Sequence, residues 1–320
     1  MSQEPFPVQR IRGPFLAAAA LAIAIASACG GPRAAEPPAA PVGPADPAAW
    51  KAETPFEGEI LFQSDADGDD EIYALTKAGV RKLTDNSWSD RYPKWSPNGE
   101  RIAFEANPNG NFGVFSMRPD GKGVDTLVDT PADETEPDWR PDGSGISFTR
   151  DDEESWAIDF ANRAEQRLVP DFRRTHGILD FSPIAPLAVF TGKRTMGWDV
   201  FSADLTAGRS TALTSGGKSC RARFSPDGRT LAYVSHLSDG WGDVWTMKPD
   251  GSAKTRVAGT DARADYFPSW SPDGKEIVFC SGTEHSPREG RWTLHLLDVA
   301  TRGVRPLFSG AERALFPDWH

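Results

Sequence analysis

Short apolar runs separated by turn-forming residues recur along the chain from residue 56 to its end. In residues 95–104, WSPNGERIAF, an aromatic residue ends one apolar run, and Ile-Ala-Phe begins the next after Ser-Pro-Asn-Gly. Pro presets φ, Asn or Asp bonds its own backbone and Gly takes a positive φ, so these residues predict a tight turn between two strands. Further copies start at other aromatic residues, namely Trp139, Phe181, Phe224 and Trp270, and a final half copy ends at Trp319.

Each copy continues with two more apolar runs. A polar loop leads to a third predicted strand, as in residues 113–117 and 243–247. Pro-Asp-Gly at 119–121 and 249–251 then predicts another turn before a short fourth strand. Four strands in about 44 residues is the period of a propeller blade.

The two ends of the repeated region complete each other. Residues 58–62 form a second strand that lacks a first strand before it, and residues 315–320 form a first strand with nothing after it. With five copies between them, the sequence predicts an all-β fold, a six-bladed β-propeller with four-stranded blades, closed by pairing of the N- and C-terminal strands. That pairing removes the open edge that the ring would otherwise leave.

The first residues carry an export signal rather than part of the fold. Arg10 and Arg12 precede an uncharged apolar run over residues 15–28, too short for a membrane-spanning helix but typical of a signal peptide. Small residues before Cys29 resemble a bacterial lipobox, so residues 1–28 are expected to be a lipoprotein-type signal peptide with lipid attachment at Cys29. An ordinary secretory signal cut at the same place is the alternative.

Residues 29–55 are rich in Pro, Ala and Gly, which is typical of a linker, and residues 56–320 are the expected propeller. In the lipoproteins that this start resembles, Asp after the cysteine retains the protein in the inner membrane. Gly30 stands there, so we expect an exported outer-membrane lipoprotein facing the periplasm, anchored to the membrane through its lipid. Exposure at the cell surface is the alternative.

Charge and composition narrow the function. The 46 Asp and Glu outnumber the 35 Lys and Arg, giving a formal net charge of -11. This balance argues against a nucleic-acid partner, which needs clustered cations. No nucleophile elbow, phosphate loop or metalloprotease motif is found, so neither a cofactor nor a metal is expected. We expect a monomer.

The repeat resembles that of the TolB-type propellers, of the form Asp-x-x-Pro-x-Trp-Ser-Pro-Asp-Gly-Lys-x-Ile-x-Phe. Asp90-x-x-Pro93-x-Trp95 and Asp265-x-x-Pro268-x-Trp270 match it closely, and Glu134 begins a conservative copy. The resemblance covers residues 56–320 and implies the fold. The same repeat occurs in periplasmic TolB, which docks onto peptidoglycan-associated lipoprotein, in peptidase propeller domains, and in oligogalacturonate lyases. Fold alone does not give function.

Candidate binding residues follow from the repeat. The acids Asp90, Glu134 and Asp265 are interpreted as structural, and positions one or two residues later are expected at the channel mouth. Those positions carry unlike side chains, which is where a ligand surface would be encoded. The candidates are Arg91, Glu136, Arg221 and Tyr266, together with His176, which occupies the repeat-acid position of its own copy.

Two other clusters are weighed. The carboxylates of residues 64–71 fail the order of a calcium loop and are interpreted as a polar hairpin. His236 and His285 fall in corresponding loops of adjacent blades, but without further ligands they are interpreted as loop histidines. Cys220 and Cys280 fall near the same end of adjacent blades. A disulfide between them is one alternative, and separate thiols are the other.

These observations favour a lipid-anchored propeller that binds or scaffolds an envelope protein, a peptide or a glycan without catalysis. The alternative is a carbohydrate lyase or hydrolase that uses the funnel. Catalysis would need histidine, arginine and carboxylate groups converging on one mouth of the channel.

Overall fold

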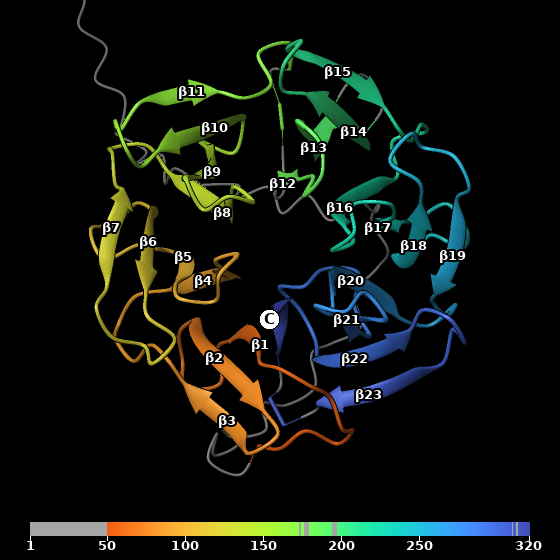
Figure 1. The fold of residues 1–320 in the computed structure, drawn as a ribbon. Helices are drawn as coiled ribbons and strands as arrows, with labels where there is room; N and C mark the ends of the chain where they lie inside the picture. Colours follow the sequence, from red (N-terminus) through yellow and green to blue (C-terminus); the bar gives the residue numbers. More distant parts are fainter. Residues whose placement is uncertain (1–49, 173, 176–178, 194–196, 309, 312) are drawn as a thin grey trace, which may run out of the picture.

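The computed structural model describes residues 50–172, 174–175, 179–193, 197–308, 310–311 and 313–320. These residues form twenty-four strands in six four-stranded antiparallel sheets, which stand around a central channel like blades (Figure 1). The predicted six-bladed propeller is confirmed. No helix in the described part of the chain has the length and apolar character needed to cross a membrane.

The blades follow the chain order, and each runs from an innermost to an outermost strand. Blade 1 contains β24 (Leu315–Trp319), β1 (Ile60–Ser64), β2 (Glu71–Thr76) and β3 (Gly79–Lys82). Blade 2 contains β4 (Asp90–Trp95), β5 (Ile102–Ala106), β6 (Gly113–Met117) and β7 (Asp125–Val128). Blade 3 contains β8 (Glu134–Trp139), β9 (Gly145–Arg150), β10 (Glu154–Asp159) and β11 (Glu165–Arg167).

The second half of the ring has the same order. Blade 4 contains β12 (Asp180–Phe181), β13 (Leu187–Lys193), β14 (Trp198–Asp204) and β15 (Arg209–Ala212). Blade 5 contains β16 (Ser219–Phe224), β17 (Leu231–Ser235), β18 (Asp243–Met247) and β19 (Thr255–Ala258). Blade 6 contains β20 (Ala264–Trp270), β21 (Glu276–Gly282), β22 (Trp292–Asp298) and β23 (Val304–Phe308).

The ring closes where the two ends of the propeller meet. Strand β24 pairs with β1 so that Trp319 lies opposite Ile60. Just beyond the strands, the Glu59 N–H donates to the His320 carbonyl at 2.8 Å, and the His320 N–H returns a bond to the Glu59 carbonyl at 3.0 Å. The predicted closure is therefore confirmed, and β1 is paired along both edges.

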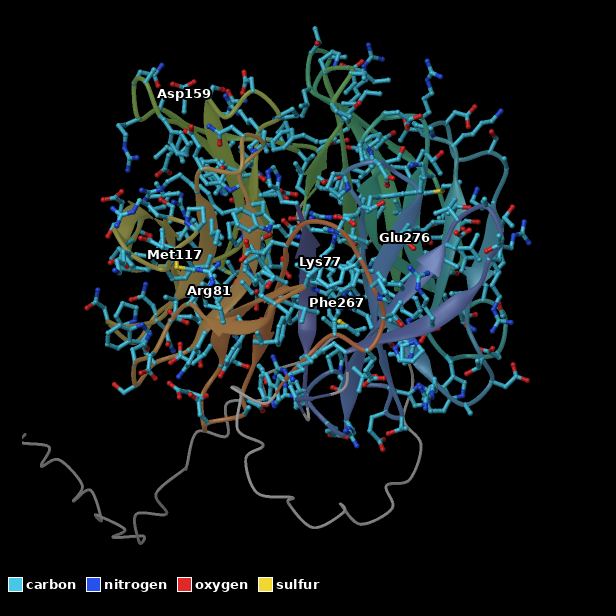
Figure 2. The ribbon with its side chains drawn as sticks, turned by 60° about the horizontal axis from the view of Figure 1, so that its bottom comes forward. Lys77, Arg81, Met117, Asp159, Phe267 and Glu276 are labelled. Carbon is cyan, nitrogen blue, oxygen red and sulfur yellow. The ribbon has the colours of Figure 1, made fainter. Side chains whose placement is uncertain are left out.

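Apolar side chains fill the spaces between neighbouring blades. Figure 2 shows the ring with its side chains from another side. The repeat tryptophans fix the blades to one another as well. The indole N–H of Trp139 donates to the Lys94 carbonyl of the preceding blade at 3.1 Å, and that of Trp270 donates to the Arg223 carbonyl at 3.2 Å. Each of these two bonds satisfies a buried donor across a blade boundary, so Trp139 and Trp270 link neighbouring blades in addition to packing between them.

The innermost strands carry a repeated β-bulge. In blades 2, 3, 5 and 6 the register shifts within the strand, and one residue of each shift has a positive φ. Proline follows that residue in three of these four blades, and again after Phe316 in blade 1. Proline suits the position after the bulge because it has no N–H that would be left unpaired. The bulge itself redirects the side chains of the strand, so it determines which residues face the channel. The positive-φ residues are Tyr92 (52°), Glu136 (55°), Arg221 (57°), Phe267 (56°) and Phe316 (53°).

Blade 4 departs from the repeat. Its innermost strand has two residues, and the following turn reads Ser-Pro-Ile-Ala-Pro instead of Ser-Pro-Asp-Gly. Ile184, in the place of the turn-forming Asp, is 65% exposed. This turn lies at the end of the propeller opposite the hairpin β1–β2, because successive hairpins alternate between the two ends.

The segment before the first strand packs on the ring from Trp50 onward. Trp50 is 3% exposed, and its ring centroid lies 5.4 Å from that of Tyr73 and 5.5 Å from that of Phe308. The Glu53 N–H donates to the Leu307 carbonyl at 2.7 Å. The last residues of the expected linker therefore contact the seam between blades 6 and 1, whereas Cys29 lies outside the described residues.

Candidate functional site

A cup of about 500 Å³ opens at one end of the channel, and we refer to it as the mouth cup. Its wall carries charged side chains of both signs from several blades, and its base is aromatic. The basic residues are Arg91, Arg221, Arg288 and Arg313, the acidic ones Asp70, Glu105, Asp133, Glu136 and Asp152, and the aromatic ones Tyr92, Phe112, Phe267 and Phe316. A concave surface with an apolar base and a polar rim is the usual form of a binding site.

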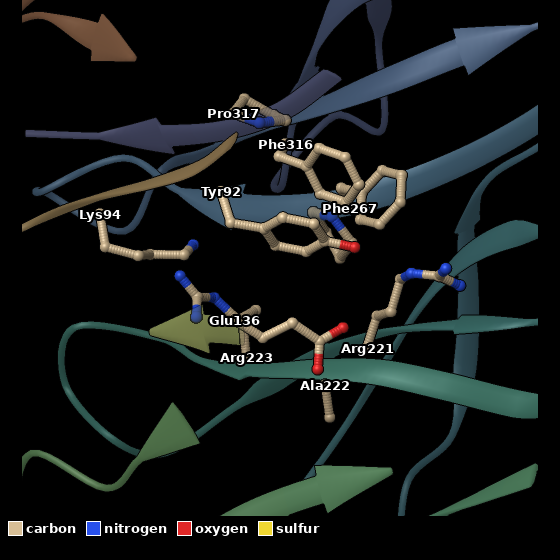
Figure 3. A pocket seen from close by; sticks show the side chains of 10 residues that line it. Tyr92, Lys94, Glu136, Arg221, Ala222, Arg223, Phe267, Phe316 and Pro317 are labelled. Atoms are coloured by element: carbon tan, nitrogen blue, oxygen red, sulfur yellow. The ribbon is translucent and has the colours of Figure 1, made fainter. Parts of the chain in front are cut away.

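The base of the cup is made by the positive-φ residues of the bulges, which we name the upper ring: Tyr92, Glu136, Arg221, Phe267 and Phe316. Three of them stack, with ring centroids 3.8 Å apart for Tyr92 and Phe316 and 3.9 Å apart for Phe316 and Phe267 (Figure 3). The Arg221 guanidinium continues the stack over Phe267, 4.4 Å from its centroid. Residues from four neighbouring blades thus form one continuous stack across the channel.

Glu136 is the upper-ring residue that stands outside this stack. It is 5% exposed, and the Thr149 hydroxyl donates to its Oε2 at 3.2 Å. Its backbone N–H donates to Glu105 Oε2 at 2.7 Å, which ties β8 of blade 3 to β5 of blade 2. Among the described residues it forms no ion pair.

Arg91 and Glu105 form a pair on the wall of the cup. The Arg91 Nη2 lies 2.7 Å from Glu105 Oε1, and its guanidinium lies 3.9 Å from the centroid of Phe112. Burial raises the pKa of the Glu105 carboxyl to about 7, although Arg91 acts in the opposite direction. Because Glu105 also accepts the Glu136 N–H, both its oxygens are committed to holding the wall.

Deeper in the channel lies the lower ring, formed by the charged residues immediately before each repeat aromatic: Lys94, Asp138, Asp180, Arg223 and Asp318. Arg223 is at its centre, with Nη1 at 2.7 Å from Asp138 Oδ2 and Nη2 at 2.9 Å from Asp318 Oδ1. Lys94 Nζ lies 2.9 Å from the same Asp318 oxygen, and Asp180 lies 3.5 Å from Arg223. Five blades are joined through these contacts.

Burial shapes the titration of the lower ring. It lowers the pKa of the Lys94 ammonium and raises the pKa of Asp138, and it raises the pKa of Asp180 to about 7. Asp318 also accepts the backbone N–H of Trp95 at 2.8 Å, and Asp180 accepts that of Phe224 at 2.6 Å. These carboxylates therefore serve as links between strands, with their cations already supplied by the chain.

Solved structures that share the fold of this chain include two from the TolB group. TolB from Acinetobacter baumannii superposes with a TM-score of 0.70 at 20% identity, covering 82% of this chain and 66% of that one. A protein described as a putative TolB from Agrobacterium tumefaciens gives a TM-score of 0.63 at 18% identity, covering 82% of this chain and 92% of that one. The chain has the TolB-like propeller fold. No family model matches it.

Sequence relatives of this TolB-like propeller match over shorter lengths. An uncharacterized protein of Agrobacterium fabrum is 31% identical over 146 residues, 43% of this chain and 49% of that protein. The Tol-Pal system protein TolB of Nitratidesulfovibrio vulgaris is 37% identical over 76 residues, 24% of this chain and 16% of that protein. The chain thus spans half or less of the length of these relatives.

An oligogalacturonate lyase solved with manganese also shares the architecture. Its TM-score is 0.53 at 16% identity, covering 78% of this chain and 73% of that one. At this identity the likeness concerns the fold alone. None of the histidines that the structure describes lines the mouth cup of this TolB-like propeller.

Three of the candidate residues come together at the cup: Arg91, Glu136 and Arg221. Tyr266 does not. It is fully buried between blades and stacks on Trp292, with ring centroids 5.4 Å apart. The placement of Tyr266 at the mouth is corrected to Phe267, because the bulge of blade 6 turns Phe267 toward the channel and leaves Tyr266 packed between blades. His176 lies outside the described residues.

The lower ring was not anticipated, although the sequence contains a signal for it. The residue before the repeat aromatic reads Lys, Asp, Asp, Arg, Ser and Asp in blade order from blade 2. Charged residues are rarely buried, so a charged residue next to the repeat aromatic in five of the six copies is unusual. Aligning the repeats on that position would have indicated a ring of opposite charges inside the channel.

A lysine of β3 lies among the carboxylates near the acidic loop after β1. Asp67, Glu71 and Asp85 converge closely enough to suggest a metal site. However, Lys82 forms ion pairs with all three, with its Nζ 3.5 Å from Glu71 Oε1. The lysine ammonium occupies the place that a divalent ion would take.

The remaining candidates are packing residues in the described part of the chain. Cys220 and Cys280 are both buried as thiols and are not bridged to each other. His236 packs near Tyr266, with ring centroids 5.7 Å apart, and His285 stacks on Trp241 at 3.8 Å. Each histidine therefore has an aromatic neighbour, His236 in the β17–β18 loop of blade 5 and His285 in the β21–β22 loop of blade 6.

Proposed function

We propose that this chain is a non-catalytic binding propeller of the bacterial envelope, and that its mouth cup receives a segment of a partner protein. The observation that carries the proposal is the composition of the cup: an aromatic base built by bulges from three blades, surrounded by a rim of both charges. Such a surface can bury apolar side chains of a peptide and pair its polar groups at the edge.

The arrangement of charges favours recognition over catalysis. The lower ring holds its cations and carboxylates in mutual ion pairs, and Glu105 is fixed by Arg91 and by a backbone N–H. A general acid or base must be free to exchange a proton with a bound substrate. The carboxylates Glu105, Asp138 and Asp180, whose pKa values are raised by burial, are instead engaged in contacts between strands.

The comparisons support a protein partner. The solved structures that resemble this chain include TolB proteins, and one relative is named for the Tol-Pal system. We further propose that the protein is exported, acts in the periplasm and is attached to the outer membrane through a lipid on Cys29. Replacement by Cys29→Ser is expected to move the protein from the membrane fraction to the soluble fraction, and unchanged partition would argue against lipidation.

The partner is tested by affinity purification from crosslinked envelopes with a matched pair of variants. Asp152 is exposed at the rim of the cup, and Glu100 is exposed in the β4–β5 turn at the opposite end. Asp152→Lys is expected to reduce capture of a specific envelope protein, while Glu100→Lys leaves it unchanged.

Equal loss in both variants would argue against the cup as the docking surface. Cleavage of polygalacturonate by the purified protein would favour the alternative, a carbohydrate lyase. The capture experiment and the cleavage assay use the same protein, so together they distinguish a binding function from a lyase function.

A further inference from the structure

The base of the mouth cup contains a buried carboxylate that the described residues leave without a countercharge. Glu136 is 5% exposed, and its hydrogen bond from Thr149 engages Oε2. Figure 3 shows its side chain directed into the pocket between Tyr92 and Arg221. A carboxylate removed from water with one neutral hydrogen bond is costly to the folded state, so its position calls for a physical reason.

The charged groups around Glu136 do not explain why its carboxylate is buried. Lys94 and Arg223, the cations below, are held by Asp318 and Asp138 at 2.7–2.9 Å. The Arg221 guanidinium is stacked on Phe267. Glu105 lies close enough that the negative charge of Glu136 contributes to raising its pKa. Of the charges around Glu136, the cations are engaged elsewhere and a nearby carboxylate repels it.

The backbone also directs this side chain inward at a cost. Glu136 has a φ of 55°, a conformation that residues with a Cβ seldom adopt. Its N–H bond to Glu105 and the following Pro137 hold it there. At the equivalent positions of blades 1, 2 and 6 the ring carries Phe316, Tyr92 and Phe267, which close the channel by stacking.

The approach to Glu136 is acidic as well. Asp133 and Asp152 lie on the rim of the cup, on the loops that flank β8 and β9 of the same blade. Tyr92 lies across the pocket from Glu136 (Figure 3). An aromatic ring and a carboxylate on opposite sides of a small pocket form an arrangement that attracts a cationic group.

We propose that the mouth cup recognises a lysine or arginine side chain of its partner, inserted along the acidic side of blade 3 to pair with Glu136. This inference rests on the proposed function and names the chemistry of the recognised segment. Asp133 and Asp152 guide the cation electrostatically, and Glu136 supplies the desolvated pair at the base.

The test is a selection of phage-displayed dodecapeptides on the immobilised wild-type protein, followed by affinity measurements on the selected peptides. We expect the selected peptides to share a lysine or arginine at a fixed position. Glu136→Gln keeps the shape and the bond from Thr149, and it should weaken these peptides at least tenfold. The matched rim variant Asp152→Asn, at an exposed carboxylate, should weaken them less than threefold.

The outcomes separate the two proposals. Selected peptides that lack a shared cation, or that bind Glu136→Gln as tightly as wild type, would overturn the cation site and leave the cup as a peptide-binding surface. Failure to select any peptide would count against the cup as a binding site altogether. Thermal unfolding of Glu136→Gln at the temperature of wild type or above it shows that weaker binding does not come from a damaged fold.

Discussion

The upper and lower rings of the channel come from the same strands, two residues apart, yet they have different relations to their surroundings. In the lower ring, Arg223 and Lys94 are balanced by three carboxylates within the protein. In the upper ring, aromatic residues stack on one side while Glu136 stands without a countercharge among the described residues. The same repeat therefore produces a structural layer and a layer suited to a ligand.

The difference shows that charge at a repeated position does not by itself mark a binding site. What separates the two layers is whether each buried charge finds its partner inside the chain. A satisfied network stabilises the ring, whereas an unsatisfied group in a cup is costly unless something binds there.

The largest effect is expected from removing the central cation of the lower ring. Arg223→Ala leaves Asp138, Asp180 and Asp318 buried without their main countercharge, and the free energy of unfolding should fall by about 3–5 kcal/mol. Urea unfolding followed by tryptophan fluorescence measures this. A loss below about 1 kcal/mol would show that the lower ring is not the structural layer described.

Truncating the middle of the aromatic stack should have the next largest effect. Phe316 is buried between Tyr92 and Phe267, so Phe316→Ala removes packing on both faces. We expect a loss of about 3 kcal/mol in the free energy of unfolding. An unchanged midpoint of thermal unfolding would mean that the stack contributes to the shape of the cup but not to the stability of the ring.

The lower ring should also make stability depend on pH. Burial raises the pKa of Asp180 to about 7, so between the pKa of the unfolded chain and that value the folded state binds more protons. The free energy of unfolding should therefore fall as pH rises from 5 to 8, with Asp180 contributing on the order of 2 kcal/mol. In Asp180→Asn the curve should be flatter, and an identical slope would contradict the assignment.

The smallest effect is expected from the arginine one layer above. Arg221 is half-buried, lies on the face of Phe267 and forms no part of the lower network. Arg221→Ala should change the free energy of unfolding by less than about 1 kcal/mol. Measured beside Arg223→Ala, it sharpens the contrast between the rings. A loss as large as that of Arg223→Ala would remove the distinction.

The fold was predictable because its information is repeated. The same turn residues and the same aromatic strand ends recur along the chain and indicate one blade geometry. Residues 58–62 and 315–320 complete a single blade. The blade count and the pairing of Ile60 with Trp319 follow from that pattern.

The site was predictable only in part. Arg91, Glu136 and Arg221 were identified from the repeat spacing, but the bulge moved the channel position from Tyr266 to Phe267. A bulge changes which side chain faces inward by one residue, and alternation along a strand does not reveal it. Aligning the repeats indicates the charges of the lower ring, but which of them pair depends on contacts between blades far apart in the chain, such as Arg223 with Asp318.

The proposed docking of a partner at the mouth cup is tested most directly by photo-crosslinking in cells. A benzophenone amino acid placed at position 92, in the upper ring, is compared with the same group at position 184, exposed at the opposite end. Our account predicts one specific crosslinked envelope protein from position 92 and none from position 184. A specific crosslink from position 184, with position 92 silent, would contradict it.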